Sequence, residues 1–269
     1  MSARGKFQKP ARRLRPFRRI RKSVSRWQRR IAIGLGLAPP LANRGYMICA
    51  TSRTGSTYLC QLLSSTGVLG NPREYFNTAG QRRRFDPAYP TDRQAQLDIV
   101  RTRGATGNGI YAVKIIGPQL LSLAGSTDPF RDLPNLAVVR IRRRDRLGQA
   151  ISLARARQTG QFIATDQPRG APAYDAGAIR HGLRSIERQE AVWDAALAQL
   201  GLQPLPITYE DIVADPQAVV DRIAAHLGLA MPVKVDQAVV THTMQRDEQS
   251  AEWRARFLAE GGDDLLANR

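Results

Sequence analysis

A short loop rich in hydroxyl side chains is the segment of this sequence best suited to bind an anion. It runs from Ala50 to Thr57 (ATSRTGST), between an apolar run and a stretch with helical spacing of leucines. A loop that leads into a helix points free backbone N–H groups and the positive end of the helix dipole at its ligand, which favours phosphate or sulfate. Arg53 adds a positive charge, and Thr54 and Ser56 add hydroxyl donors. The loop predicts an oxyanion site; the alternative is an ordinary turn that caps a helix.

The loop departs from a nucleoside triphosphatase P-loop at two positions. Gly55 and Thr57 stand where that motif has its second glycine and its final Ser/Thr, but Ala50 replaces the first glycine and Ser56 replaces the lysine. Because that lysine contacts the β- and γ-phosphates, its absence argues against a triphosphatase. A small-molecule kinase with a degenerate P-loop stays open as an alternative.

A second basic segment, Arg140–Asp145 (RIRRRD), follows another apolar run and leads into a predicted helix. Ser152 lies eight residues beyond Arg144, two turns into that helix. The carboxyl ends of parallel strands meet at one edge of a sheet, so both segments are expected there. Alone, this segment is equally well a solvated charge run at a helix start. Two anion sites on one edge predict a ligand with phosphates at both ends of a nucleoside.

The elements that would position these sites alternate between strands and helices. Apolar runs predict strands at 46–50, 110–116, 136–141 and 205–209, and helical spacing predicts helices at 92–103, 145–158, 175–200 and 216–227. Asp215 is expected to cap the last helix at its N-terminus and Gly228 at its C-terminus, and residues 68–93 are expected to be a loop. The alternation predicts an α/β fold, with a P-loop-like parallel sheet flanked by helices on both faces.

The net charge of +18 is concentrated in the first part of the chain. Residues 1–30 hold thirteen Lys and Arg and no acid, and the first acidic residue is Glu74. We therefore divide the chain into a basic, flexible arm at 1–42 and a single α/β domain at 43–269, whose own charge is nearly balanced. The arm is suited to an anionic membrane surface, while no specific nucleic-acid binding is expected of the domain. A cleaved targeting segment or a misassigned start are alternatives for the arm.

Cysteine and histidine usage excludes two other kinds of protein. The 269 residues include only two Cys and three His, and none of the five has the spacing of metal ligands. We therefore expect neither a disulfide scaffold nor a metal site.

Taken together, the two anion segments and a third stretch resemble the sulfotransferases that use 3′-phosphoadenosine 5′-phosphosulfate (PAPS). The loop Arg53–Thr57 is similar to their 5′-phosphosulfate loop, Arg144 and Ser152 match their 3′-phosphate pair spaced by eight, and Tyr209–Leu229 matches the segment after a later strand. More narrowly, the stretches 48–57, 72–76 and 143–153 resemble the bacterial trehalose 2-sulfotransferase-like family.

The resemblance implies the sulfotransferase fold and transfer of a sulfuryl group from PAPS to a hydroxyl of a carbohydrate or small metabolite. It assigns the general base to Glu74 and stabilisation of the leaving phosphate to Arg53, without a metal. Arg53, Thr54, Gly55, Ser56, Thr57, Arg144 and Ser152 would bind the co-substrate. It also favours a homodimer that acts on a sugar or glycolipid. The arm has no counterpart in the resemblance; its charge alone suggests peripheral attachment to the membrane through residues 1–30, and the low cysteine content fits the cytoplasm. We expect loops 77–93 and 159–175 to form much of the acceptor pocket.

Three points stay open. The Lys-Gly loop near the carboxyl end of many eukaryotic cytosolic sulfotransferases is absent, so the remaining 3′-phosphate contacts are unassigned. Without the resemblance, the residues favour a surface salt bridge of Glu74 with Arg73 or with the Arg82–Arg84 run. The rival functions are the kinase, which requires Mg²⁺ and ATP, and a non-catalytic polyanion or membrane adaptor that acts through the arm.

Overall fold

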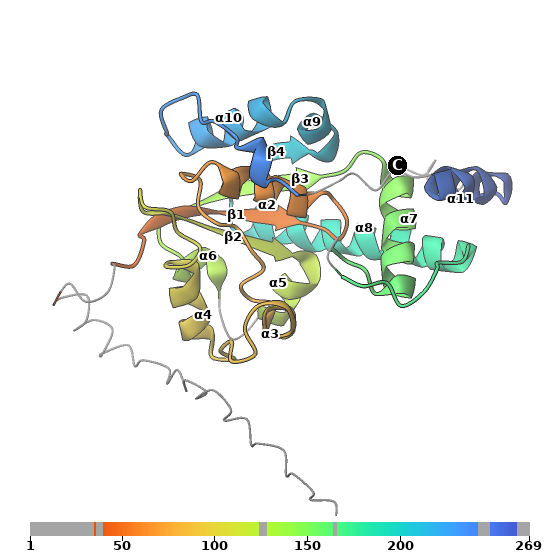
Figure 1. Ribbon diagram of the computed structural model, residues 1–269, viewed down its shortest axis with the longest axis horizontal. Coiled ribbons are helices and arrows are strands. Elements are labelled where there is room, and N and C mark those ends of the chain that lie inside the picture. The colour runs from red at the N-terminus through yellow and green to blue at the C-terminus, as the bar shows by residue number, and fades with distance from the viewer. Residues whose placement is uncertain (1–34, 36–39, 124–127, 164–165, 242–247, 263–269) are drawn as a thin grey trace, which may run out of the picture.

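A parallel sheet forms the centre of the computed structural model, which describes residues 35, 40–123, 128–163, 166–241 and 248–262 (Figure 1). Its strands are β1 (Arg44–Ala50), β2 (Ile110–Ile116), β3 (Leu136–Arg142) and β4 (Leu205–Thr208). They lie in the order β2-β1-β3-β4, and every neighbouring pair is parallel. The predicted parallel α/β fold is therefore confirmed.

The central strand β1 is buried on both of its faces, which explains why its sequence is a continuous apolar run rather than an alternating one. Successive side chains point to opposite faces. Tyr46 and Ile48 join one hydrophobic cluster, whereas Met47 and Cys49 join a second cluster on the other side.

Helices cover both faces of the sheet, as predicted (Figure 1). In the first cluster the covering helices are α2 (Ser56–Ser65), α9 (Tyr209–Ala214) and α10 (Pro216–His226). In the second they are α4 (Arg93–Val100), α5 (Gly117–Leu123) and the carboxyl half of α8 (Ala176–Gln199). The short α6 (Pro129–Asp132) lies on the same side as α4 and α5.

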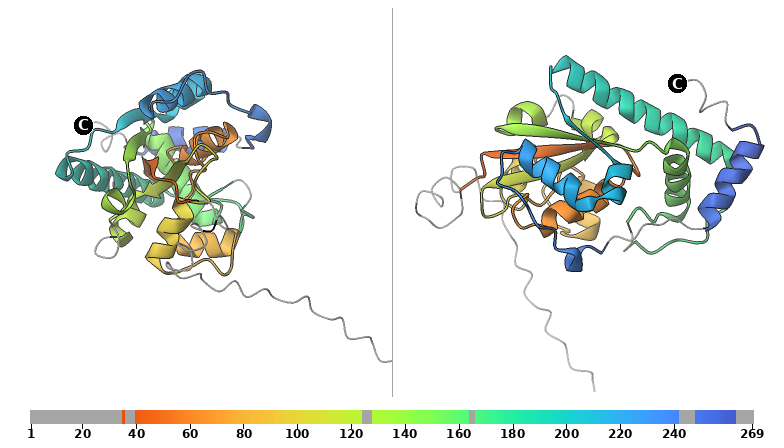
Figure 2. Two further views of the ribbon diagram at one scale, coloured as in Figure 1. Left: turned by 90° about the vertical axis from the view of Figure 1, so that its left-hand side faces the viewer. Right: turned by 90° about the horizontal axis from the view of Figure 1, so that it is seen from above.

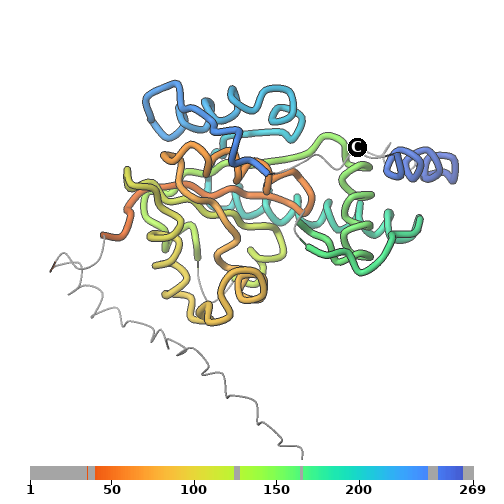
Figure 3. Tube along the Cα trace, in the orientation of Figure 1, coloured from red at the N-terminus to blue at the C-terminus, as the bar shows by residue number. Residues whose placement is uncertain are grey.

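A third hydrophobic cluster lies beyond the carboxyl ends of the strands. It joins α7 (Arg146–Thr159), the amino half of α8 and α11 (Glu248–Ala259), with Trp253 and Phe257 of α11 buried in it. Seen from above, α8 runs past the end of the sheet to reach this cluster (Figure 2). The tube in Figure 3 shows α7 and α11, far apart in the sequence, close to each other. The edge of the sheet that carries the two anion segments therefore faces a separate helical wall.

The boundaries of the predicted elements agree with the structure to within a few residues, but α5, α6, α9 and α11 were not predicted, and a further helix lies where a loop was expected. Residues 68–93 were expected to be a loop, but they contain α3 (Thr78–Arg84). This helix has no apolar periodicity and is capped by Asn77, whose side chain accepts a hydrogen bond from the Gly80 N–H at 3.0 Å. Asp215 caps α10 as expected, while Gly228, with φ of 66°, lies one residue beyond the C-cap Leu227.

No helix in the described ranges is both long and apolar enough to cross a bilayer. A 3₁₀ turn, η1 (Gln237–Val239), follows α10. The predicted basic arm at 1–30 lies outside the described residues.

Candidate functional site

A cavity of about 1500 Å³ opens at the carboxyl ends of β1, β2 and β3. On one side it is lined by the loop after β1, the end of β2, the start of α7 and α3. On the other it is lined by residues between 161 and 172 and by α11, whose Ala251, Arg254, Ala255 and Leu258 recur at helical spacing. Both loops that we expected to form the acceptor pocket, 77–93 and 159–175, contribute to it.

The loop between β1 and α2 presents an open helix end to this cavity. Gly55 is the N-cap of α2 with φ of 80°, and no side chain in the described part of the chain caps the helix. A Cβ atom on Gly55 would come within 2.4 Å of the Tyr209 ring, so the position requires glycine for space as well as for its positive φ. Ser56 and Thr57 of the first turn line the cavity. The uncapped N–H groups and the helix dipole suit this helix end to an anion.

Arg53 lies at the centre of the site. Its Nε donates to Ser152 Oγ at 2.9 Å, so two residues predicted on separate segments are brought together, and its Nη1 donates to the Phe162 carbonyl at 2.5 Å. Burial lowers the pKa of Arg53, and the nearby cations Arg143 and Arg155 lower it further. Such crowding of like charges indicates a place for a polyanion.

A group of basic and hydroxyl side chains lines the same cavity as Ser152. Arg143 and Arg254 both pair with Asp145, at 3.2 and 2.5 Å, and Arg155 Nη1 donates to Ser250 Oγ at 2.6 Å. All of them line the cavity. Arg143 also lies over the Tyr209 ring at 4.7 Å, and its buried Nε has no hydrogen-bond partner among the described residues. A buried donor of this kind requires an acceptor from a ligand or from water.

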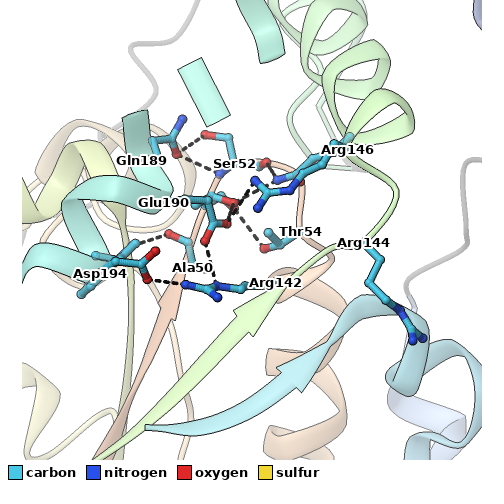
Figure 4. Close-up of polar contacts among 12 residues, drawn as sticks. Ala50, Ser52, Thr54, Arg142, Arg144, Arg146, Gln189, Glu190 and Asp194 are labelled. Atoms are coloured by element: carbon cyan, nitrogen blue, oxygen red, sulfur yellow. Dashed lines mark hydrogen bonds and ion pairs between the residues drawn. The ribbon is translucent and has the colours of Figure 1, made fainter. Parts of the chain in front are cut away.

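Arg144, which we predicted to be a phosphate ligand, does not lie in the cavity. Its side chain is 69% exposed and lies 3.6 Å from Glu210 Oε2. Glu210 also accepts the backbone N–H groups of Arg144 and Asp145, both at 3.1 Å, and this turns Arg144 towards α9. Figure 4 shows it apart from the other labelled side chains. The structure places the neighbouring Arg143 there instead.

Glu74 lies in the segment between α2 and α3 and is held from both sides. Its Oε1 is 2.9 Å from Lys114 Nζ, and its Oε2 accepts from Gln119 Nε2 at 2.6 Å and from Asn77 Nδ2 at 3.0 Å. Burial acts to raise the pKa of Glu74, but Lys114 and these hydrogen bonds outweigh it and lower the pKa to about 2. The carboxylate is ionised at neutral pH and lines the cavity. Glu74 pairs with Lys114 and not with Arg73 or the Arg82–Arg84 run, the partners that we considered as the alternative.

Lys114 of β2 is a site residue that the sequence reasoning missed. Its side chain is 8% exposed, and its Nζ donates to Thr57 Oγ1 at 3.3 Å while pairing with Glu74. Burial acts to lower the pKa of Lys114, but the carboxylate raises it above its usual value, so the ammonium is kept. The sequence does contain an indication of this role, because a charged residue within an apolar strand needs a partner. Lys114 connects the carboxylate to the anion loop.

The segment between residues 161 and 172, which lines part of the cavity, is joined to α3 by a salt bridge. Arg84 Nη2 lies 2.9 Å from Asp166 Oδ2, and Asp166 accepts the N–H groups of Phe162 and Ile163. Within the described ranges, no group of three or more His, Cys, Asp or Glu could hold a metal ion.

Comparisons with known proteins show what this chain is similar to. Residues 45–260 match the sequence profile described as Stf0 sulphotransferase. A trehalose 2-sulfotransferase from Mycobacterium tuberculosis is 29% identical over 81% of this chain and 96% of its own, and one from Mycolicibacterium smegmatis is 28% identical over 82% and 97%. Among solved structures, a sulfotransferase from Mycobacterium avium matches with a TM-score of 0.47 and 13% identity, over 87% of this chain and 74% of the other.

Proposed function

The chain belongs to the Stf0 sulphotransferase family, and on that premise we propose that it transfers a sulfuryl group from PAPS to a hydroxyl of a carbohydrate. The observation that carries the proposal is one cavity that holds both an ionised carboxylate, Glu74, and an uncapped, arginine-bearing anion loop. The names of the two curated relatives support a sugar as acceptor.

The charges of the cavity fit PAPS, which is anionic at both ends. The lining has many more cations than carboxylates: Arg53, Arg83, Arg84, Lys114, Arg143, Arg155 and Arg254 against Glu74 and Asp145. We assign the 5′-phosphosulfate to the loop Arg53–Thr57, where the helix end and Arg53 meet it. We assign the 3′-phosphate to Ser152, Arg143, Arg155 and Arg254. This assignment keeps Ser152 of the predicted pair and gives the place of Arg144 to the other three residues.

In the proposed reaction, the acceptor oxygen forms a new bond to sulfur as the bond from sulfur to the phosphate oxygen breaks. The acceptor proton goes to Glu74, and the electron pair of the broken bond stays on the phosphate. Arg53 and the N-terminus of α2 stabilise the charge that develops there. Most of the acceleration then comes from positioning and electrostatics, as in phosphoryl transfer.

In this scheme Lys114 interacts with two groups: the carboxylate of Glu74, which takes the acceptor proton, and the phosphate that leaves. With its pKa held at about 2, Glu74 is a weak base. The Lys114 ammonium is also within 3.3 Å of Thr57 Oγ1, beside the loop that would hold the leaving phosphate. As negative charge grows on that phosphate, the ammonium shifts its interaction towards it. The pKa of Glu74 rises in consequence, when the acceptor proton has to be taken.

Adenosine 3′,5′-bisphosphate is expected to bind without metal and to stabilise the protein. At 100 times its dissociation constant, a ligand that binds only the folded state adds about 2.7 kcal/mol to the free energy of unfolding. Differential scanning calorimetry with and without EDTA measures this. A midpoint that rises only with ATP and Mg²⁺ would favour the kinase, and a midpoint that responds to neither would favour the adaptor.

Arg143→Ala is expected to weaken binding of adenosine 3′,5′-bisphosphate about tenfold or more, because hydrogen bonds to charged groups each contribute about 1.5–3 kcal/mol. Arg144→Ala is the matched control, since it removes the same side chain one residue along. Its dissociation constant should stay within twofold of the unaltered protein. Isothermal titration calorimetry of both variants decides the assignment, and the opposite order would restore Arg144 as the phosphate ligand.

Other expectations concern the location, the assembly and the domain organisation of the protein. A homodimer follows from the resemblance, a cytoplasmic location from the low cysteine content, and contact with an anionic membrane from the thirteen cations of residues 1–30. The division into an arm at 1–42 and one domain at 43–269 rests on charge and pattern. We keep all of these as proposals.

A further inference from the structure

The base of the anion loop is held by side chains of α8, which is distant in sequence. Gln189 Oε1 accepts two hydrogen bonds from Ser52, one from its N–H at 2.9 Å and one from its hydroxyl at 3.1 Å. Glu190 Oε1 accepts from the Thr51 hydroxyl at 3.3 Å. One turn further, Trp193 Nε1 donates to the Ala50 carbonyl at 2.8 Å. Figure 4 shows this side of α8 against the loop.

A side chain of α7 also binds the base of the anion loop. Gln149 Nε2 donates to Thr51 Oγ1 at 2.9 Å and to the Ser52 carbonyl at 2.7 Å. Gln149, Gln189 and Glu190 are all buried. Gln149 Oε1 has no hydrogen-bond partner among the described residues. The other buried polar atoms named here are paired, and a different arrangement of the loop would leave them unpaired as well, which favours this one.

An ion-pair cluster fixes α8 to the sheet at the same level. Glu190 pairs with the buried Arg140 of β3, and its Oε2 lies 3.0 Å from Arg142 Nε. Rotation or sliding of α8 would leave a buried charge without its partner, which is strongly unfavourable. Gln189 is therefore presented to Ser52 from a fixed position.

The loop needs such support because it is strained at its central residue. Arg53, which directly follows Ser52, has φ of 64°, a left-handed conformation that is unfavourable for a residue with a Cβ. Strained backbone of this kind persists only where its surroundings hold it. Here the residue before Arg53 is held through its N–H, its hydroxyl and its carbonyl.

We propose that Gln189 is a positioning residue for the anion loop, which it holds so that Arg53 and the N-terminus of α2 face the ligand, with Glu190 fixing Gln189 in place. The inference rests on the proposed binding of PAPS at this loop. Gln189 itself makes no contact with the reacting atoms in this scheme and acts through Ser52 and Arg53.

Gln189→Met tests it, because methionine has nearly the same length but offers Ser52 no oxygen acceptor. The variant is expected to bind adenosine 3′,5′-bisphosphate at least tenfold more weakly by calorimetry, whereas its melting midpoint without ligand stays close to that of the control. Asp194→Asn is that control. Asp194 is half exposed and pairs with Arg142 in the same cluster without touching the loop, so its variant should bind as the unaltered protein does.

A double-variant cycle with Ser52→Ala keeps the test decisive if Gln189→Met also lowers the melting midpoint. Removing the Ser52 hydroxyl should weaken binding in the unaltered protein but have little further effect when Gln189 is already methionine. Unchanged affinity in Gln189→Met, or fully multiplicative losses in the double variant, would overturn the inference. If the unaltered protein itself fails to bind the nucleotide, it is the proposed function that fails.

Discussion

Replacing Glu74 with glutamine is expected to lower kcat by about 10²–10⁴-fold, the usual cost of losing a general base. Glutamine keeps the shape of the side chain and one oxygen acceptor, so Asn77 and Gln119 retain a partner. The affinity for adenosine 3′,5′-bisphosphate should hardly change, because Glu74 is assigned to the acceptor hydroxyl. Steady-state rates at saturating concentrations of both substrates, together with calorimetry, separate these two effects.

Asp86→Asn provides the control for this substitution. Asp86 is a carboxylate between α3 and α4, pairs with Arg103 at 3.7 Å and does not line the cavity. Its variant should turn over like the unaltered enzyme. A Glu74→Gln enzyme with kcat within threefold of normal would remove Glu74 from the reaction, and an equal loss in both variants would point to damage to the loop.

Lys114→Met is expected to lower kcat by about 10²–10³-fold, in line with the loss of one preorganised charge donor at a developing negative charge. It should also destabilise the fold, because Glu74 is left partly buried without its cation. The sign of the pH effect follows from the pKa of about 2. The Lys114 pairing stabilises the protein above the ordinary Glu pKa and ceases to do so as pH falls towards 2. In the variant the pKa of Glu74 rises, so this contribution disappears.

The double variant Lys114→Met, Glu74→Gln distinguishes a catalytic role of Lys114 from a structural one. Removing the unpaired carboxylate should restore part of the melting midpoint. Because Glu74→Gln alone already lowers kcat, the double variant is compared with that single variant: a further fall in kcat shows that Lys114 acts on the leaving phosphate, whereas an equal kcat shows that Lys114 only holds Glu74 in place. Thermal denaturation and initial rates on the same preparations provide both measurements.

The sheet and the position of the anion loop could be predicted from the sequence because both depend on local signals. Apolar runs mark β1 and β2 whatever their neighbours are, since both faces of a parallel strand are covered. The loop is recognisable from its own glycine and hydroxyl residues. The helix α3 was missed because it has no apolar stripe and depends on the Asn77 cap and on its surroundings.

The charges of the site were harder to assign because their partners are not local. In the sequence, Lys114 is a single charged residue within an apolar strand. Its partner is Glu74, which lies forty residues earlier in the chain. The choice between Arg143 and Arg144 depends on which way the chain turns as it leaves β3. Glu210 of α9 decides that turn through two backbone hydrogen bonds, and nothing in the RIRRRD segment contains that information.

The separate cluster of α7, α8 and α11 has a consequence for how enzymes of this fold could acquire new acceptors during evolution. Trp253 and Phe257 anchor α11 in that cluster, while Ala251, Ala255 and Leu258 on its other side line the cavity. Substitutions on this side change the shape of the pocket without entering the two clusters that flank the sheet. Drift in acceptor preference is thus uncoupled from the sheet and from the anion loop. A lineage could exchange the sugar it modifies and keep the same sulfuryl donor, provided that Arg254 of the same helix is retained for the 3′-phosphate.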